Sequence, residues 1–190
     1  MFPHAKWRMD KTVRAVYLTF DDGPIPEATP FILETLRAYD AHATFFMVGD
    51  NVRKYPDLYK RVVAEGHQIG NHTYHHLGGL KHLTSTYVED TEKANALIGA
   101  HLFRPPHGIM TPMEYRRLRK KYDIVMWDLV TRDYSNRLTA EDVVENVRRY
   151  ARNGSIITFH DSLKSIDKLH TALPASLEWL REQGYEMKLL

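Results

Sequence analysis

Two adjacent carboxylates stand at the end of an apolar run in the segment YLTFDDGP, residues 17–24. Asp21 and Asp22 are followed at once by Gly23 and Pro24, which end the run. Neighbouring like charges repel each other unless each has a different partner. One carboxylate could bind a divalent metal while the other accepts a proton from activated water. The pair is therefore a candidate for hydrolytic chemistry, and the competing interpretation is a polar exit from a strand.

The segment NHTYHH (71–76) places His72 and His76 four residues apart, with His75 between them. If the segment forms one helical turn, both imidazoles lie on one face. Two imidazoles and one carboxylate would give three protein ligands and leave a position for water, as catalytic metal sites do. The chain has eleven His, so a polar His-rich loop is the competing interpretation, and it has no Cys, which excludes thiolate ligands.

Ionisable residues also follow three other apolar runs. They are Arg104 and His107 in RPPHG, Asp128, Arg132 and Asp133 in WDLVTRDY, and His160 and Asp161 in FHD. Arg104 is the candidate partner that keeps Asp21 ionised. His160 ends the most apolar run, SIITFH, and is either a core imidazole or a general acid whose ring Asp133 orients.

Strand-like and helix-like segments alternate along the chain and must position these residues. Runs rich in β-branched and aromatic residues predict strands at 14–20, 43–49, 67–71, 101–105, 123–129, 155–160 and 185–190. Amphipathic stretches predict helices at 26–40, 56–66, 84–100, 111–122, 139–154 and 166–184. This α/β alternation predicts a distorted (β/α) barrel with about seven parallel strands, and an open doubly wound sheet is the alternative. In such barrels the active site forms at the carboxyl ends of the strands.

The composition restricts the class of protein. The 190 residues suit a single domain, 1–190, with residues 1–13 as an N-terminal extension. A net charge of +2 argues against a nucleic-acid partner, and no stretch approaches the ~20 apolar residues of a membrane helix. The first residues lack the apolar region of a secretory signal, although a signal could have been trimmed, so the compartment stays open. We expect a monomer or weak oligomer.

Five motifs, taken together, resemble those of the polysaccharide deacetylases of carbohydrate esterase family 4, the NodB-homology domain. They are TFDDGP (19–24), HTYHH (72–76), RPPHG (104–108), RDY (132–134) and TFH (158–160). The first two are the specific ones, and the resemblance covers roughly residues 14–190. It implies a distorted (β/α) barrel and metal-dependent removal of acetyl groups from an acetylated glycan, most often the N-acetyl of a GlcNAc-type sugar.

The resemblance also implies roles for individual residues. Asp22, His72 and His76 would bind one divalent metal, with zinc as the first expectation and cobalt or nickel also compatible. The acid–base groups would be Asp21 as general base held by Arg104, and His160 as general acid tuned by Asp133. The backbone N–H of His107 would help to stabilise the oxyanion, and Tyr134 would help to wall the substrate groove.

The chain departs from the family pattern at three positions. His107 stands where the family has Tyr or Phe, Tyr134 replaces the usual Trp, and Thr158 replaces the usual Leu. Because these positions shape the acetyl pocket, a hydrolase of another amide or of an O-acetyl ester stays open as an alternative. A non-catalytic sugar-binding relative is the third hypothesis.

Overall fold

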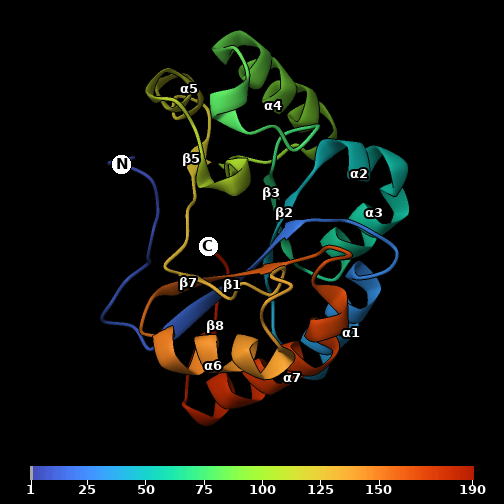
Figure 1. The fold of residues 1–190 in the computed structure, drawn as a ribbon, viewed down its shortest axis with the longest axis vertical. Coiled ribbons are helices and arrows are strands. Elements are labelled where there is room, and N and C mark those ends of the chain that lie inside the picture. The colour runs from blue at the N-terminus through green and yellow to red at the C-terminus, as the bar shows by residue number, and fades with distance from the viewer. Residues whose placement is uncertain (1) are drawn as a thin grey trace.

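The computed structural model describes residues 2–190 (Figure 1). The strands are β1 (Ala15–Asp22), β2 (Thr44–Met47), β3 (Gln68–Asn71), β4 (Leu102–Phe103), β5 (Asp123–Ile124), β6 (Leu129–Val130), β7 (Ser155–His160) and β8 (Glu186–Met187). The α-helices are α1 (Thr29–Ala38), α2 (Gly49–Lys54), α3 (Pro56–Ala64), α4 (Thr84–Ile98), α5 (Pro112–Leu118), α6 (Ala140–Tyr150) and α7 (Ile166–Glu182). Two short 3₁₀ turns are η1 (Gly79–Lys81) and η2 (Pro106–Gly108).

Seven parallel strands form a curled sheet in the order β5-β4-β3-β2-β1-β7-β6, and β8 pairs with the start of β1. The sheet curls into a half-barrel, which confirms the predicted distorted (β/α) barrel. Helices surround the sheet, and Figure 1 shows α6 and α7 side by side next to β1 and β7. No helix within residues 2–190 is long and apolar enough to cross a membrane.

The central strands β1 and β7 sort their side chains by alternation. Val16, Leu18 and Phe20 of β1 join the large core that packs against the helices. The intervening residues of β1 face the inside of the barrel, where Tyr17 belongs to a separate buried cluster. Thr19 and Asp21 follow Tyr17 on this inner face. The inward-facing residues of β1 thus end in a carboxylate at the carboxyl end of the strand.

The predicted strand 123–129 is wrong as one element, because the structure divides it into β5 and β6. β5 pairs with β4 and β6 pairs with β7, which lie on opposite sides of the strand order. The residues between them cross from one side to the other: the N–H of Val125 donates to Phe103 O, and that of Asp128 donates to Ile156 O. This crossing segment brings the two ends of the half-barrel together.

The N-terminal extension runs along this crossing segment. Lys6 forms a parallel bridge with Val125, and Arg8 forms an antiparallel bridge with Ser155 at the start of β7. The N–H of Lys6 donates to Ile124 O at 2.8 Å. Residues 6–8 therefore pair both with the crossing segment and with the start of β7.

Helix starts follow the capping signals in the sequence. The Thr111 hydroxyl accepts from the N–H of Glu114, whose carboxylate accepts from the N–H of Thr111, at the start of α5. Thr139 and Asp142 form the same reciprocal pair at the start of α6. The short helix α2 was not predicted, since its six residues are fewer than the periodicity of an amphipathic helix needs.

Candidate active site

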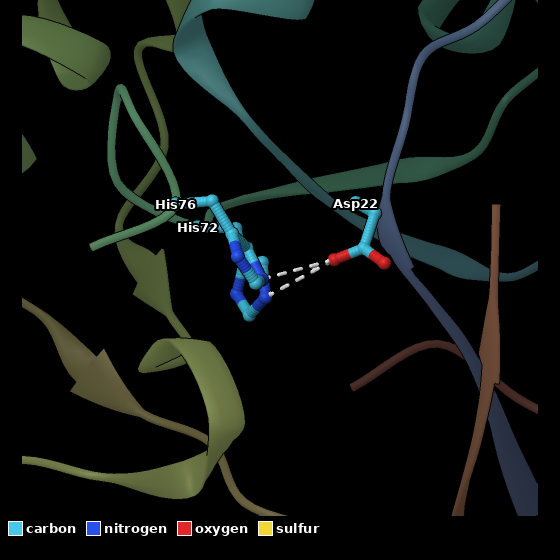
Figure 2. A group of neighbouring side chains, drawn as sticks. All are labelled: Asp22, His72 and His76. Carbon is cyan, nitrogen blue, oxygen red and sulfur yellow. Dashed lines mark ion pairs between the residues drawn. The ribbon is translucent and has the colours of Figure 1, made fainter. Parts of the chain in front are cut away.

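Three side chains that could bind a metal converge at the carboxyl ends of β1 and β3 (Figure 2). Oδ1 of Asp22 lies 3.2 Å from Nε2 of His76 and 3.7 Å from Nε2 of His72. One ligand atom from each residue lies within 4.8 Å of the others. Figure 2 shows the two imidazoles together, facing the carboxylate across a small gap.

The loop after β3, rather than a helical turn, brings His72 and His76 together. Thr73 and His76 have left-handed backbone conformations, with φ of 63° and 55°. Oδ2 of Asp90, in α4, accepts the N–H groups of Tyr74 and His75 at 2.8 and 3.0 Å. The two imidazoles thus come together without the helical turn considered in the sequence, because hydrogen bonds to Asp90 in α4 hold the loop.

Hydrogen bonding and charge prepare the cluster for a cation. Nδ1 of His72 lies 2.7 Å from the carbonyl oxygen of Arg104; a carbonyl only accepts, so Nδ1 carries the proton and Nε2 keeps a free lone pair. Burial lowers the pKa of His72 to about 4. Burial opposes ionisation of Asp22, but the hydrogen bond from His76 and the nearby His72 outweigh it and lower the pKa of Asp22 to about 2.

This donor set fits a divalent metal ion. Metal binding needs neutral imidazole and ionised carboxylate, which are the states that the environments of His72 and Asp22 favour at neutral pH. Two nitrogens and one oxygen suit zinc and other first-row divalent ions alike, so the donor set leaves the metal's identity open.

Asp21, next in the chain to Asp22, binds a fully buried arginine instead. Nη1 of Arg104 donates to Oδ1 of Asp21 at 2.7 Å and to the Thr19 hydroxyl at 2.8 Å. Nη2 of Arg104 donates to Met126 O at 2.7 Å, in the segment that crosses the half-barrel. The ring of Phe46 lies 4.2 Å from the guanidinium carbon. Arg104 thus connects the carboxyl end of β1 to the closure of the barrel.

His160, at the end of β7, is next to Asp21 in the strand register and is held by Asp133. Its Nδ1 lies 2.7 Å from Oδ1 of Asp133, and its backbone N–H donates to Oδ2 of the same carboxylate at 2.7 Å. Burial opposes the charged imidazolium, but the ion pair with Asp133 outweighs it and raises the pKa of His160 to about 9. The ring of Tyr134 meets that of His160 edge-on at 4.7 Å and stays partly exposed.

His107 adjoins the metal cluster through His76. Its ring contacts that of His76 edge-on, with centroids 4.7 Å apart, and its φ of 58° is left-handed. Among the hydrogen bonds formed by residues 2–190, none uses the N–H of His107 as donor. Burial lowers the pKa of the His107 imidazole.

Four residues singled out in the sequence do not join these groups. Asp128 lies at the opposite end of the sheet, paired with Arg152 and with Ser155 at the start of β7. His75 turns toward Asp90. Arg132 is exposed, and Asp161 is buried, where it accepts from the Thr29 hydroxyl at 2.7 Å.

Two supporting residues were not recognised in the sequence. Thr19 accepts from Arg104 and lies 3.1 Å from the Thr158 hydroxyl; its position two residues before Asp21, on the same strand face, was the available signal. Gly23 approaches the Asp161 carboxylate so closely that a Cβ would lie 1.9 Å from Oδ2. That contact joins two strand ends, and the available signal was the place of Gly23 in the motif TFDDGP (19–24).

Comparisons with known proteins agree with this geometry. The sequence model of the family described as polysaccharide deacetylase matches residues 8–127. A peptidoglycan-N-acetylglucosamine deacetylase of Bacillus cereus is 33% identical over 196 residues, covering 96% of this chain and 89% of the relative.

Solved structures share the whole fold. The crystal structure of the Bc1960 peptidoglycan N-acetylglucosamine deacetylase superposes with a TM-score of 0.89 at 30% identity, covering 98% of this chain and 91% of that one. The structure of a pseudoenzyme of the same esterase family from Bacillus anthracis superposes with a TM-score of 0.85 at 26% identity, covering 95% and 65% of the two chains. The protein belongs to the polysaccharide deacetylases of carbohydrate esterase family 4.

Proposed function

We propose that the protein is a metal-dependent hydrolase that removes the N-acetyl group from GlcNAc-type sugars in a peptidoglycan-type glycan. The observation that carries the proposal is the convergence of the Asp22, His72 and His76 cluster with two separately partnered groups, Asp21 and His160. The similarity to a peptidoglycan-N-acetylglucosamine deacetylase over nearly the whole chain supports the choice of glycan.

Two residues of the chain, Asp21 and His160, would each carry out one proton transfer. A divalent cation held by the cluster would lower the pKa of the attacking water and polarise the acetyl carbonyl. Asp21 would accept the proton that the water loses on attacking the carbonyl carbon, with Arg104 keeping the carboxylate ionised beforehand. His160 would donate its proton to the amine nitrogen as the carbon–nitrogen bond breaks. Acetate and the free amine are then the products.

Two further groups would complete the site. The N–H of His107 would donate to the developing oxyanion, and Tyr134 would form part of the wall around the acetyl group. Asp133 would hold the His160 ring in position and keep it charged. These roles are proposals for this chain, supported by the 2.7 Å contact between His160 and Asp133 and by the ring contacts of His107 and Tyr134.

Acetate release from a panel of acetylated glycans, with and without chelator, tests the proposal. The Asp21→Asn variant should keep its metal but lose rate by roughly 10²–10⁴-fold, the usual contribution of a general base. Asp128→Asn, the same substitution at the far end of the sheet, is the matched control and should keep the rate. Full activity in Asp21→Asn would contradict the assignment of the base.

A second candidate is hydrolysis of another amide or an O-acetyl ester at the same groups. His107 and Tyr134 favour it, because they place a titratable ring and a smaller aromatic ring where the family pattern has other side chains. A non-catalytic sugar-binding role is the third candidate, because a solved relative is described as a pseudoenzyme. Preferential turnover of O-acetyl or non-sugar amide substrates would identify the second candidate. Saccharide binding without acetate release by the metal-loaded protein would identify the third.

A further inference from the structure

A cavity of about 580 Å³ lies between the N-terminal extension and α5, apart from the metal cluster. Its apolar lining includes Phe2, Met110 and Tyr115. The Phe2 and Tyr115 rings lie 4.9 Å apart, and the Tyr115 hydroxyl accepts from the N–H of His4 at 3.0 Å. The N-terminal extension is thus tied to α5 and forms one wall of the cavity.

Three cations, Arg116, Arg119 and Lys120, also line this cavity, and no acidic residue does. Within residues 2–190, none of the three forms an ion pair with a carboxylate. The guanidinium of Arg119 lies 5.9 Å from the Tyr115 ring centroid, so one charge sits beside the aromatic surface. Arginine offers paired N–H donors that match a carboxylate or phosphate, so an uncompensated cluster of this kind favours an anionic ligand.

One residue of the cavity lining is close in the sequence to a neighbour of the metal cluster. Met110, in its lining, is three residues from His107, whose ring contacts His76 of the metal cluster. Three residues of extended chain span at most about 10 Å. Met110 therefore lies within about 10 Å of His107, a separation that a polymer held at the metal cluster must span to reach the cavity.

We propose that this cavity binds carboxylate-bearing peptide branches of the glycan strand on which the active site acts. The inference rests on the proposed function and adds a second contact to it. Arg116, Arg119 and Lys120 receive the carboxylates, and Phe2 and Tyr115 contact the apolar parts of the branch. The cavity gives affinity for the branched polymer and takes no part in the chemical step.

The test compares two charge-matched triple variants. One is Arg116→Gln/Arg119→Gln/Lys120→Gln in the cavity. The other is Arg117→Gln/Arg148→Gln/Arg149→Gln, which removes three exposed cations that do not line the cavity. Each is assayed on acetylated peptidoglycan with intact peptide branches and on the same glycan stripped of its peptides.

We expect the cavity variant to raise KM on the branched glycan by roughly tenfold, which corresponds to about 1.4 kcal/mol of binding. Its kcat, and both constants on the stripped glycan, should match those of the unaltered protein. The control triple should leave all four values unchanged. An equal rise in KM in both triples, or no rise in the cavity variant, would overturn the proposal.

Binding without turnover separates this proposal from the proposed function. Metal-free protein is sedimented with insoluble branched or stripped peptidoglycan at low and moderate salt. The unaltered protein and the control triple should sediment with the branched material, and the cavity variant should not. This result supports binding in the cavity, even if no substrate is deacetylated. Equal retention of the unaltered protein on both materials contradicts it, even if deacetylation is observed.

Discussion

The guanidinium of Arg104 and the carboxylate of Asp21 form a buried ion pair, with 2.7 Å between Nη1 and Oδ1. Arg104 also donates to Thr19 and to the carbonyl oxygens of Val125 and Met126. Burial lowers the pKa of Arg104, and the adjacent Asp21 charge opposes that effect. The pair thus has a structural role, since it links β1 to the segment that crosses the half-barrel, besides its place in the proposed site.

Replacing Arg104 with Met should lower the free energy of unfolding by about 3–5 kcal/mol, the usual cost of leaving a buried charge without its partner. The free energy of unfolding of Arg104→Lys should lie between those of the unaltered protein and Arg104→Met. Lysine keeps the charge, but one ammonium cannot reach all the acceptors that surround a planar guanidinium. Chemical denaturation of metal-free protein measures both. Arg152→Gln, which breaks the pair at the far end of the sheet, is the control and should cost much less because Arg152 is exposed. An equal loss in Arg152→Gln would argue against a special role for Arg104.

His76→Ala should abolish stoichiometric metal binding, since it leaves only Asp22 and His72 of the three proposed ligands. The loss of metal affinity in His76→Ala should exceed the 10–100-fold loss that is typical when a residue that only orients a metal-binding side chain is replaced. His75→Ala is the matched control, because that ring contacts Asp90 and not the cluster. Metal content after dialysis against a weak chelator reports both variants. Equal metal loss from the two would mean that loop structure, rather than ligation, determines binding.

Asp133→Asn should move the basic limb of the pH–rate profile to lower pH. The carboxylate raises the pKa of His160 to about 9, so the proposed general acid stays protonated up to that pH. Without the negative charge, burial dominates and the pKa of His160 falls.

The ion pair of His160 with Asp133 also stabilises the fold. This contribution is fully present below pH ~6.5, the ordinary pKa of imidazole, and it is lost as the pH rises through about 9.

The profile of kcat/KM against pH, together with an NMR titration of His160, measures this change. Asp128→Asn makes the same substitution beside Arg152 and should leave the limb in place. If the limb also stayed in place in Asp133→Asn while NMR showed a lower His160 pKa, the limb would belong to another group. His160 would then lose its assignment as the acid.

The convergence of carboxylates and imidazoles could be predicted because the carboxyl ends of parallel strands meet at one edge of the barrel. Spacing alone suggested that His72 and His76 are neighbours. The backbone between them could not be predicted, because Asp90, in a helix farther along the chain, holds that loop.

The division of the predicted strand 123–129 had a similar cause. The apolar composition of residues 123–129 indicates a largely buried segment, but pairing with β4 at one end and with β7 at the other depends on residues distant in the sequence. Asp128 follows an apolar run, as the site residues do, yet it lies at the opposite end of the sheet. A pattern of ionisable residues after apolar runs therefore overpredicts the site wherever a strand boundary is misplaced.

Asp161→Asn should stabilise the metal-free protein increasingly as the pH rises. Oδ2 of Asp161 accepts from the Thr29 hydroxyl, whereas Oδ1 has no hydrogen-bond partner within residues 2–190. Burial raises the pKa of Asp161 to about 8, and the Asp22 charge adds to the effect. A carboxyl group with a raised pKa destabilises the fold as the pH rises from its unfolded value near 4 to its folded value near 8, and the loss is constant above that.

Asparagine has the same shape and cannot ionise, so the variant's advantage in free energy of unfolding should grow between pH 4 and 8 and then level off. Denaturation in the presence of chelator, at several pH values, measures the difference. Asp128→Asn should behave oppositely: burial raises the pKa of Asp128, but Arg152 and Ser155 outweigh burial and lower it, so that variant loses stability at neutral pH. If the Asp161→Asn curve ran parallel to that of the unaltered protein, Asp161 would have an ordinary pKa in the folded protein, and burial would not destabilise its charged form.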